Sequence, residues 1–212
     1  MNDVLEALRW RYATKIFSPQ IVCEEDLNIL LESLRLAPSS YGLQPWRIDI
    51  LPRGKFKDQV SSIAFDQPQI QSCSHLVVLS ARNNLDINYI NEHIETSINT
   101  NPSSQSHLHI FKQAIIDTLL DGDPKANVPI LSWAQRQTYI ALGILIETAA
   151  ILRIDACPME GFVNEALDKH LGITKGEYSS TALVALGYRS PDDTYQKMQK
   201  TRFSKDEIIF FQ

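Results

Sequence analysis

A long apolar segment near the middle of the sequence places the strongest constraint on the fold. Residues 132–153 are predicted to form one helix, and after Tyr139 its apolar side chains lie nearly all round the helix axis. Such a helix belongs in the interior of a protein or between two subunits. The most apolar stretch, residues 138–154, is interrupted by Glu147 and Arg153 and is too short and too charged for a membrane span, so the sequence argues against a transmembrane helix.

Apolar residues recur at helical spacing in several other segments. The further helices predicted from this spacing cover residues 2–12, 24–36, a broken stretch over 85–121, and 163–171. Acidic residues open the second of these helices and Pro38 stops it, while Gly172 ends the last one. A polar surface loop over 99–106 interrupts the broken stretch, and residues 121–124 break it again.

Strands are predicted where β-branched and apolar residues form short runs. They cover residues 46–51, 75–80 and 181–188, with a short extended segment at 154–158. The continuous apolar centre of 75–80 indicates burial on both faces. Helices and strands are mixed along the chain and no linker divides it. We therefore expect one domain over 1–212, of α/β or α+β class, with helices around one sheet.

The C-terminal segment 207–211 is apolar and β-prone. Exposed at an edge, it would promote aggregation. We expect it to add a strand to a sheet, either that of its own chain or that of a partner.

Composition excludes several classes of protein. The net charge of −5 and pI near 5.5 leave no basic excess for nucleic acid. Cys23, Cys73 and Cys157 are odd in number and form no CxxC pair, which favours reduced thiols over a disulfide framework. The five histidines show no zinc-ligand spacing with them, so no metal site is expected. The N-terminus lacks the pattern of a signal peptide, and we expect a cytoplasmic protein.

Two groups of cations lie at opposite ends of the chain. The first group, at the end of the first helix and in the turn after it, contains Arg9, Arg11 and Lys15. The second group, near the C-terminus, contains Lys200 and Arg202. Neither GxGxxG nor GxxxxGK[ST] occurs, so any bound phosphate must be held by side-chain cations. The alternatives are that the first group complements a helix dipole and that the second lies in a solvated loop.

Two further segments combine rigid backbone with polar groups. The loop 38–46 carries two hydroxyls and an amide between two prolines, although it could simply connect a helix to a strand. The turn 158–161 ends in Gly161, which permits an unusual backbone angle or a close approach by a ligand. The alternative for this turn is the N-terminal turn of a helix, with Glu160 favouring the dipole.

In identity and order, these segments resemble the nitroreductase family of FMN-dependent NAD(P)H oxidoreductases. The resemblance covers nearly the whole chain. It is carried by Arg11-x-x-x-Lys15, Pro38-Ser-Ser-x-x-x-Gln-Pro-Trp46, the strand after Ser74-His75, the long helix from Trp133, Pro158-x-Glu-Gly161 and Lys200-x-Arg202.

The resemblance implies an α+β homodimer with a central mixed sheet flanked by helices. The long helix would form much of the interface, the C-terminal strand would be exchanged between subunits, and FMN would lie at the interface. Arg11, Lys15, Lys200 and Arg202 would hold the phosphate and ribityl end. The other implied FMN contacts are Tyr12, Ala13, Pro38, Ser39, Ser40, Gly42, Gln67, Gln69, Pro158, Met159, Glu160 and Gly161.

Within that set, Pro38, Ser39 and Ser40 would come from the other subunit. The Glu160 backbone N–H would lie near flavin N5.

Three positions depart from the family pattern. Ala13 stands where relatives often have Ser, which removes one hydroxyl contact, and Gly42 stands where they often have Asn. Gln69 occupies a place where some relatives carry Lys. A neutral amide there stabilises an anionic reduced flavin less than a cation does, which lowers the reduction potential.

The implied activity is a ping-pong reduction, in which NAD(P)H gives a hydride to flavin N5 and a nitroaromatic, a quinone or a second flavin is then reduced. The cofactor carries this chemistry, in keeping with the lack of a GxSxG or HExxH motif. Alternatives are an FMN-binding storage or sensor protein and a cofactor-free interaction protein. Within enzymes, the same fold also serves flavin-consuming, dehalogenating and azoline-oxidising reactions.

Overall fold

A four-stranded sheet forms the centre of the computed structural model, which describes residues 3–120, 129–173 and 176–212. Its strands are β1 (Trp46–Pro52), β2 (His75–Arg82), β3 (Asp155–Met159) and β4 (Tyr178–Gly187). Their order is β1-β2-β4-β3, and every neighbouring pair is antiparallel. Leu76 and Val78 face one side of the sheet while Val77 and Leu79 face the other, and all four are fully buried. The prediction that the strand at 75–80 is buried on both faces is confirmed.

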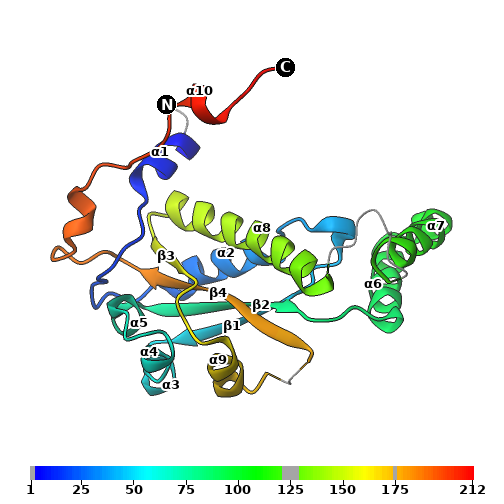
Figure 1. Ribbon diagram of the computed structural model, residues 1–212, viewed down its shortest axis with the longest axis horizontal. Coiled ribbons are helices and arrows are strands. Elements are labelled where there is room, and N and C mark those ends of the chain that lie inside the picture. The colour runs from blue at the N-terminus through cyan, green and yellow to red at the C-terminus, as the bar shows by residue number, and fades with distance from the viewer. Residues whose placement is uncertain (1–2, 121–128, 174–175) are drawn as a thin grey trace.

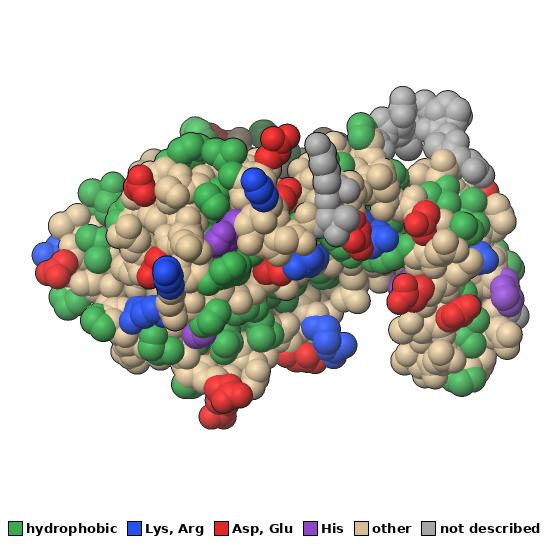
Figure 2. Space-filling model, turned by 90° about the horizontal axis from the view of Figure 1, so that it is seen from below, with side chains coloured by type: hydrophobic (Ala, Val, Ile, Leu, Met, Phe, Trp, Pro, Cys, Tyr) green, Lys and Arg blue, Asp and Glu red, His purple; other side chains and the backbone are tan. Residues whose placement is uncertain are grey.

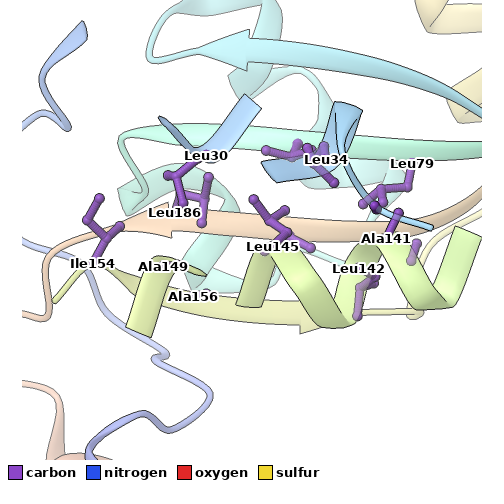
Figure 3. Packing of buried hydrophobic residues seen from close by; sticks show 14 of the residues in the cluster. Leu30, Leu34, Leu79, Ala141, Leu142, Leu145, Ala149, Ile154, Ala156 and Leu186 are labelled. Carbon is purple, nitrogen blue, oxygen red and sulfur yellow. The ribbon is translucent and has the colours of Figure 1, made fainter. Parts of the chain in front are cut away.

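The long helix α8 (Ile130–Ile151) lies along one face of the sheet beside α2 (Glu24–Arg35), as Figure 1 shows. In Figure 3, Leu30 and Leu34 of α2 and Leu145 of α8 point toward Leu79 and Leu186 of the sheet. The predicted central helix is therefore confirmed. Its sheet-facing side chains are buried, whereas part of its opposite side is exposed.

Short helices cover the second face of the sheet (Figure 1). They are α3 (Lys55–Asp58), α4 (Val60–Ile63), α5 (Pro68–Ser72) and α9 (Asn164–Leu171). Val60, Ile70 and Leu167 pack against Leu76 and Leu183 in this second core. The helix α1 (Asp3–Trp10) lies near one end of α8.

The helices α6 (Ile87–Thr100) and α7 (Gln105–Ile115) form a separate lobe around Ile90, Ile94 and Ile115. Figure 2 shows this lobe set off from the body by an indentation, with charges of both signs interspersed on the face in view. The expected polar loop over 99–106 is shorter than predicted, because α6 continues to Thr100 and α7 begins at Gln105. The predicted break at 121–124 lies outside the described residues.

One expectation about the sheet needs correction. The sheet is antiparallel rather than mixed, and within the described ranges the parallel pairing is the isolated bridge between Ala13 and Ala156. Within the described residues, the C-terminal tail adds no strand to its own sheet, and its addition to the sheet of a partner stays a prediction. Glu207 belongs instead to α10 (Lys205–Ile208), where Ser204 and Glu207 form a capping box, and the end of the chain lies away from the sheet (Figure 1).

No helix in the described parts of the chain is both long enough and apolar enough to span a membrane.

The end of β4 approaches its neighbours closely at Gly187. A Cβ atom there would lie 2.8 Å from Phe17 Cδ1 and 3.3 Å from the Ser74 backbone nitrogen. We expect Gly187→Ala to lower the free energy of unfolding by about 1–3 kcal/mol, measured by urea denaturation. Gly143→Ala in α8 is the matched control, because among the described residues no atom beyond its chain neighbours and the backbone of its own helix lies within 4 Å of the added Cβ. Equal stability of both variants would contradict the close packing at Gly187.

Candidate functional site

The structure brings together the two cation groups from opposite ends of the sequence. The Lys200 side chain donates hydrogen bonds to the backbone oxygens of Arg9, at 2.8 Å, and of Arg11. The segment leading to α10 thus runs beside the end of α1 (Figure 1). Burial, followed by the charge of Arg202, lowers the pKa of Arg11. Burial, followed by the charges of Arg11 and Arg202, lowers the pKa of Lys200.

In the part of the chain that the structure describes, no carboxylate lies in ion-pair contact with these cations. Within the described residues, none of Arg11, Lys15, Lys200 and Arg202 forms an ion pair. The Arg11 Nε atom is buried and has no hydrogen-bond partner. A buried donor without a partner is costly, and like charges repel one another. The cluster is therefore suited to a multiply charged anion.

Two buried carboxylates shape the backbone that carries these cations. Asp193 accepts hydrogen bonds from the backbone nitrogens of Lys15, at 2.7 Å, and Ile16, at 3.2 Å, and from the Tyr12 hydroxyl, at 3.2 Å. Asp155 accepts a hydrogen bond from Thr14 Oγ1 at 3.2 Å and forms an ion pair with Arg189. Sequence reasoning missed both carboxylates, since Asp193 lies 178 residues from Lys15 and no local spacing connects them.

Strand β3 connects the cation cluster to the turn 158–161. Ala13 bridges to Ala156, and Lys15 Nζ lies 3.7 Å from Cys157 Sγ. Glu160 lies three positions after Cys157, and three steps of extended chain span about 10 Å. An elongated ligand with an anionic end at the cluster could therefore reach the turn.

The turn offers two backbone donors. Neither the Glu160 nor the Gly161 N–H donates a hydrogen bond within the described residues. The Gly161 oxygen accepts a hydrogen bond from Gln67 Nε2 at 2.8 Å, and Gln69 Nε2 lies 3.0 Å from Met159 Sδ. The two glutamines predicted to contact a ligand are thus adjacent to the turn, and they leave its donors free.

A cavity of about 370 Å³ adjoins the turn. It is lined by Tyr139, Leu142, Pro158, Met159, Glu160 and Ala182. The Tyr139 hydroxyl donates a hydrogen bond of 2.5 Å to Glu160 Oε1. Sequence reasoning treated Tyr139 only as part of the central helix, because no motif marks it as a site residue.

The loop 38–46 is held by α8 and lies apart from the cation cluster. The Ser40 backbone nitrogen donates to Gln137 Oε1 at 2.9 Å, and Ser39 Oγ accepts from the Gln44 nitrogen at 2.8 Å. Gly42 has a positive φ of 69° and lies near His93. In the described parts of the chain, no hydrogen bond joins this loop to the cluster or to the turn.

Comparison with known proteins shows the family to which the chain belongs. The model of the Nitroreductase family matches residues 8–188, so the chain belongs to the nitroreductase family.

Two curated relatives and one solved structure illustrate the similarity. "Putative NAD(P)H nitroreductase SSP0379" of Staphylococcus saprophyticus is 33% identical, over 98% of this chain and 96% of the relative. "Putative NAD(P)H nitroreductase YfkO" of Bacillus subtilis is 30% identical, over 98% and 96%. A nitroreductase-type structure from Exiguobacterium sibiricum, solved in complex with FMN, superposes with a TM-score of 0.83 at 18% identity, over 100% of this chain and 98% of that one. The last comparison supports the fold alone.

Proposed function

We propose that this protein is an FMN-dependent NAD(P)H oxidoreductase that reduces nitroaromatics, quinones or flavins. The observation that carries the proposal is the cluster of cations around Arg11, of which none forms an ion pair within the described residues and whose Arg11 Nε atom is buried without a hydrogen-bond partner. Support also comes from the relatives named as NAD(P)H nitroreductases and from the FMN complex of a protein with the same fold.

The residues present suit FMN. Its phosphate carries up to two negative charges, and Arg11, Lys15, Lys200 and Arg202 supply cations for it. Arg11 Nε in particular is a buried donor that needs an acceptor. At the other end of β3, the Glu160 and Gly161 N–H groups could provide the neutral hydrogen bonds that a flavin ring requires, while the Gln67 and Gln69 amide nitrogens bond to Gly161 and Met159 of the turn.

When bound, FMN would supply the hydride chemistry that links oxidation of NAD(P)H to reduction of the second substrate, and ping-pong kinetics are expected. The protein's part is to bind and orient. The cluster would fix one end of the cofactor, and the turn, anchored through Gln67, would present its backbone donors to the ring. No side chain has to act as a nucleophile.

We further propose that the protein functions as a homodimer. On the outward side of α8, Tyr139, Ile140 and Ile151 are 40%, 42% and 50% exposed, and Phe210 and Phe211 in the tail are 75% and 98% exposed. A second subunit would cover these groups and bring its Ser39–Ser40 loop to the cofactor. Sedimentation equilibrium is expected to show a dimer, and an FMN-loaded monomer would contradict this.

Anaerobic spectroscopy tests the proposed activity. The purified protein, reconstituted with FMN, is expected to bleach with NADH or NADPH and to recover its flavin absorbance on addition of menadione or a nitrofuran. Failure to bind FMN would overturn the proposal. Flavin that stays oxidised with both nucleotides would favour a storage or sensor protein instead.

Substitution of Gln69 tests how the protein sets the midpoint potential of the bound flavin. Gln69→Lys is expected to raise the midpoint potential of bound FMN by at least about 30 mV, because a cation favours the anionic reduced form. Gln69→Glu is the matched variant and is expected to lower the potential. Dye-equilibration titration measures both. A shift of the same sign in both variants would show that Gln69 acts only through packing.

A further inference from the structure

Two hydrogen bonds hold the Glu160–Gly161 turn from opposite sides. From the side of α5, Gln67 Nε2 donates to the Gly161 backbone oxygen at 2.8 Å. From α8, the Tyr139 hydroxyl donates to the Glu160 carboxylate at 2.5 Å. Among the residues that the structure describes, neither the Glu160 nor the Gly161 backbone N–H donates a hydrogen bond when both of these bonds are made. The Tyr139 bond is the one that engages a charge.

The position of Tyr139 is fixed by the core beneath it. Ala141, Leu142 and Leu145 on the same helix are buried against the sheet. Leu142, one turn along from Tyr139, lines the same cavity. A tyrosine has few rotatable bonds, so a rigid helix sets the place of its hydroxyl with little loss of conformational entropy. Tyr139 can therefore hold Glu160 in one place.

The bond also changes the electrostatics of the cavity wall. Hydrogen bonds to a carboxylate are short and strong, and they spread its charge onto the donor. Burial, followed by the hydrogen bond and charge of Glu160, raises the pKa of Tyr139 to about 12. The phenol therefore stays protonated and donating at neutral pH. Without it, the Glu160 charge would be less shielded and the side chain free to move within the cavity.

We propose that Tyr139 is a positioning residue that sets the reduction potential of the bound flavin by restraining and shielding the carboxylate of Glu160. The inference rests on the proposed function, since it requires FMN beside this turn. An unshielded carboxylate penalises a reduced, anionic flavin more than an oxidised, neutral one. Loss of the Tyr139 hydroxyl should therefore weaken the binding of reduced FMN selectively.

A double-mutant cycle tests this pairing. The dissociation constant of oxidised FMN and the midpoint potential are measured for the wild type, Tyr139→Phe, Glu160→Ala and the double variant. For each protein, the dissociation constant and the midpoint potential together give the ratio of its affinities for reduced and oxidised FMN. Tyr139→Phe is expected to lower this ratio about tenfold, and Glu160→Ala to raise it. The double variant is expected to match Glu160→Ala, because the hydroxyl then has no carboxylate to act on.

Tyr178→Phe is the matched control. It removes a hydroxyl that accepts from Arg82 Nη1 at 2.9 Å, at the start of β4, and it is expected to leave the ratio unchanged. Equal weakening of both redox states by Tyr139→Phe would overturn the inference, as would an effect of the same size in the Glu160→Ala background. A wild-type protein that binds no FMN would instead overturn the proposed function itself.

Discussion

Replacing Arg11 with alanine is expected to weaken FMN binding about a hundredfold, without destabilising the FMN-free protein. Two charge-assisted hydrogen bonds of about 1.5–3 kcal/mol each would be lost from the complex, enough for a change of this size. Without the cofactor, the same guanidinium destabilises the folded protein, because its Nε atom is buried without a hydrogen-bond partner. Burial and the charge of Arg202 also disfavour the charged form of Arg11. The substitution should therefore have opposite effects on the loaded and the empty protein.

Fluorescence titration with FMN and thermal unfolding with and without FMN would measure both effects. Arg11→Lys keeps the charge but loses the planar fork, so its affinity should be intermediate. Arg202→Ala is also expected to weaken FMN retention, though less, since Arg202 is exposed. Undiminished FMN affinity in Arg11→Ala, or equal destabilisation of both forms, would show that Arg11 serves the fold rather than a phosphate.

The second large effect is expected from substitution of Asp193, which should lower the stability of the folded protein. Its carboxylate accepts three backbone N–H bonds, from Lys15, Ile16 and Tyr195, and one from the Tyr12 hydroxyl. Asparagine cannot accept all of these bonds and brings a donor of its own. Asp193→Asn is therefore expected to lower the free energy of unfolding by about 2–4 kcal/mol at neutral pH, as measured by urea denaturation.

The pH dependence of this loss follows from the pKa of Asp193. Burial raises that pKa, but the hydrogen bonds from Lys15, Ile16 and Tyr195 outweigh burial, and the net change is downward. A lowered pKa in the folded state stabilises the protein above the unfolded value of about 3.9, and the benefit disappears as pH falls. The difference in the free energy of unfolding between wild type and Asp193→Asn should thus be largest at neutral pH and become smaller in acid.

Asp192→Asn is the control for this series, since Asp192 is the exposed neighbour of Asp193. It should match the wild type in stability. A difference between wild type and Asp193→Asn that grew on acidification would contradict the assigned role.

Local signals in the sequence predicted much of the fold. Acidic residues at 24–26, apolar spacing and Pro38 predicted the second helix to within one residue of α2. Gly172 ends α9 in the left-handed conformation, with φ of 65°, as its position after an apolar run suggested. Signals of this kind are read within a few residues, which is why they succeed.

Contacts between distant segments could not be predicted in the same way. The sheet is antiparallel because β4 inserts between β2 and β3, and no pattern within one strand encodes its neighbours. The bond between Asp193 and Lys15 spans 178 positions of the sequence. The bonds of Asp155 to Thr14 and of Tyr139 to Glu160 span 141 and 21 positions. The cation groups and the turn were predicted because they are short motifs, whereas the residues that position them carry no motif.

Comparison of FMN with riboflavin tests the central claim most directly, because the two ligands differ only in the phosphate. If the cluster around Arg11 holds that phosphate, the wild type should bind FMN at least about a hundredfold more tightly than riboflavin. In Arg11→Ala, the ratio of the affinities for FMN and riboflavin should be much smaller. Equal affinity of the wild-type protein for the two ligands would contradict the account.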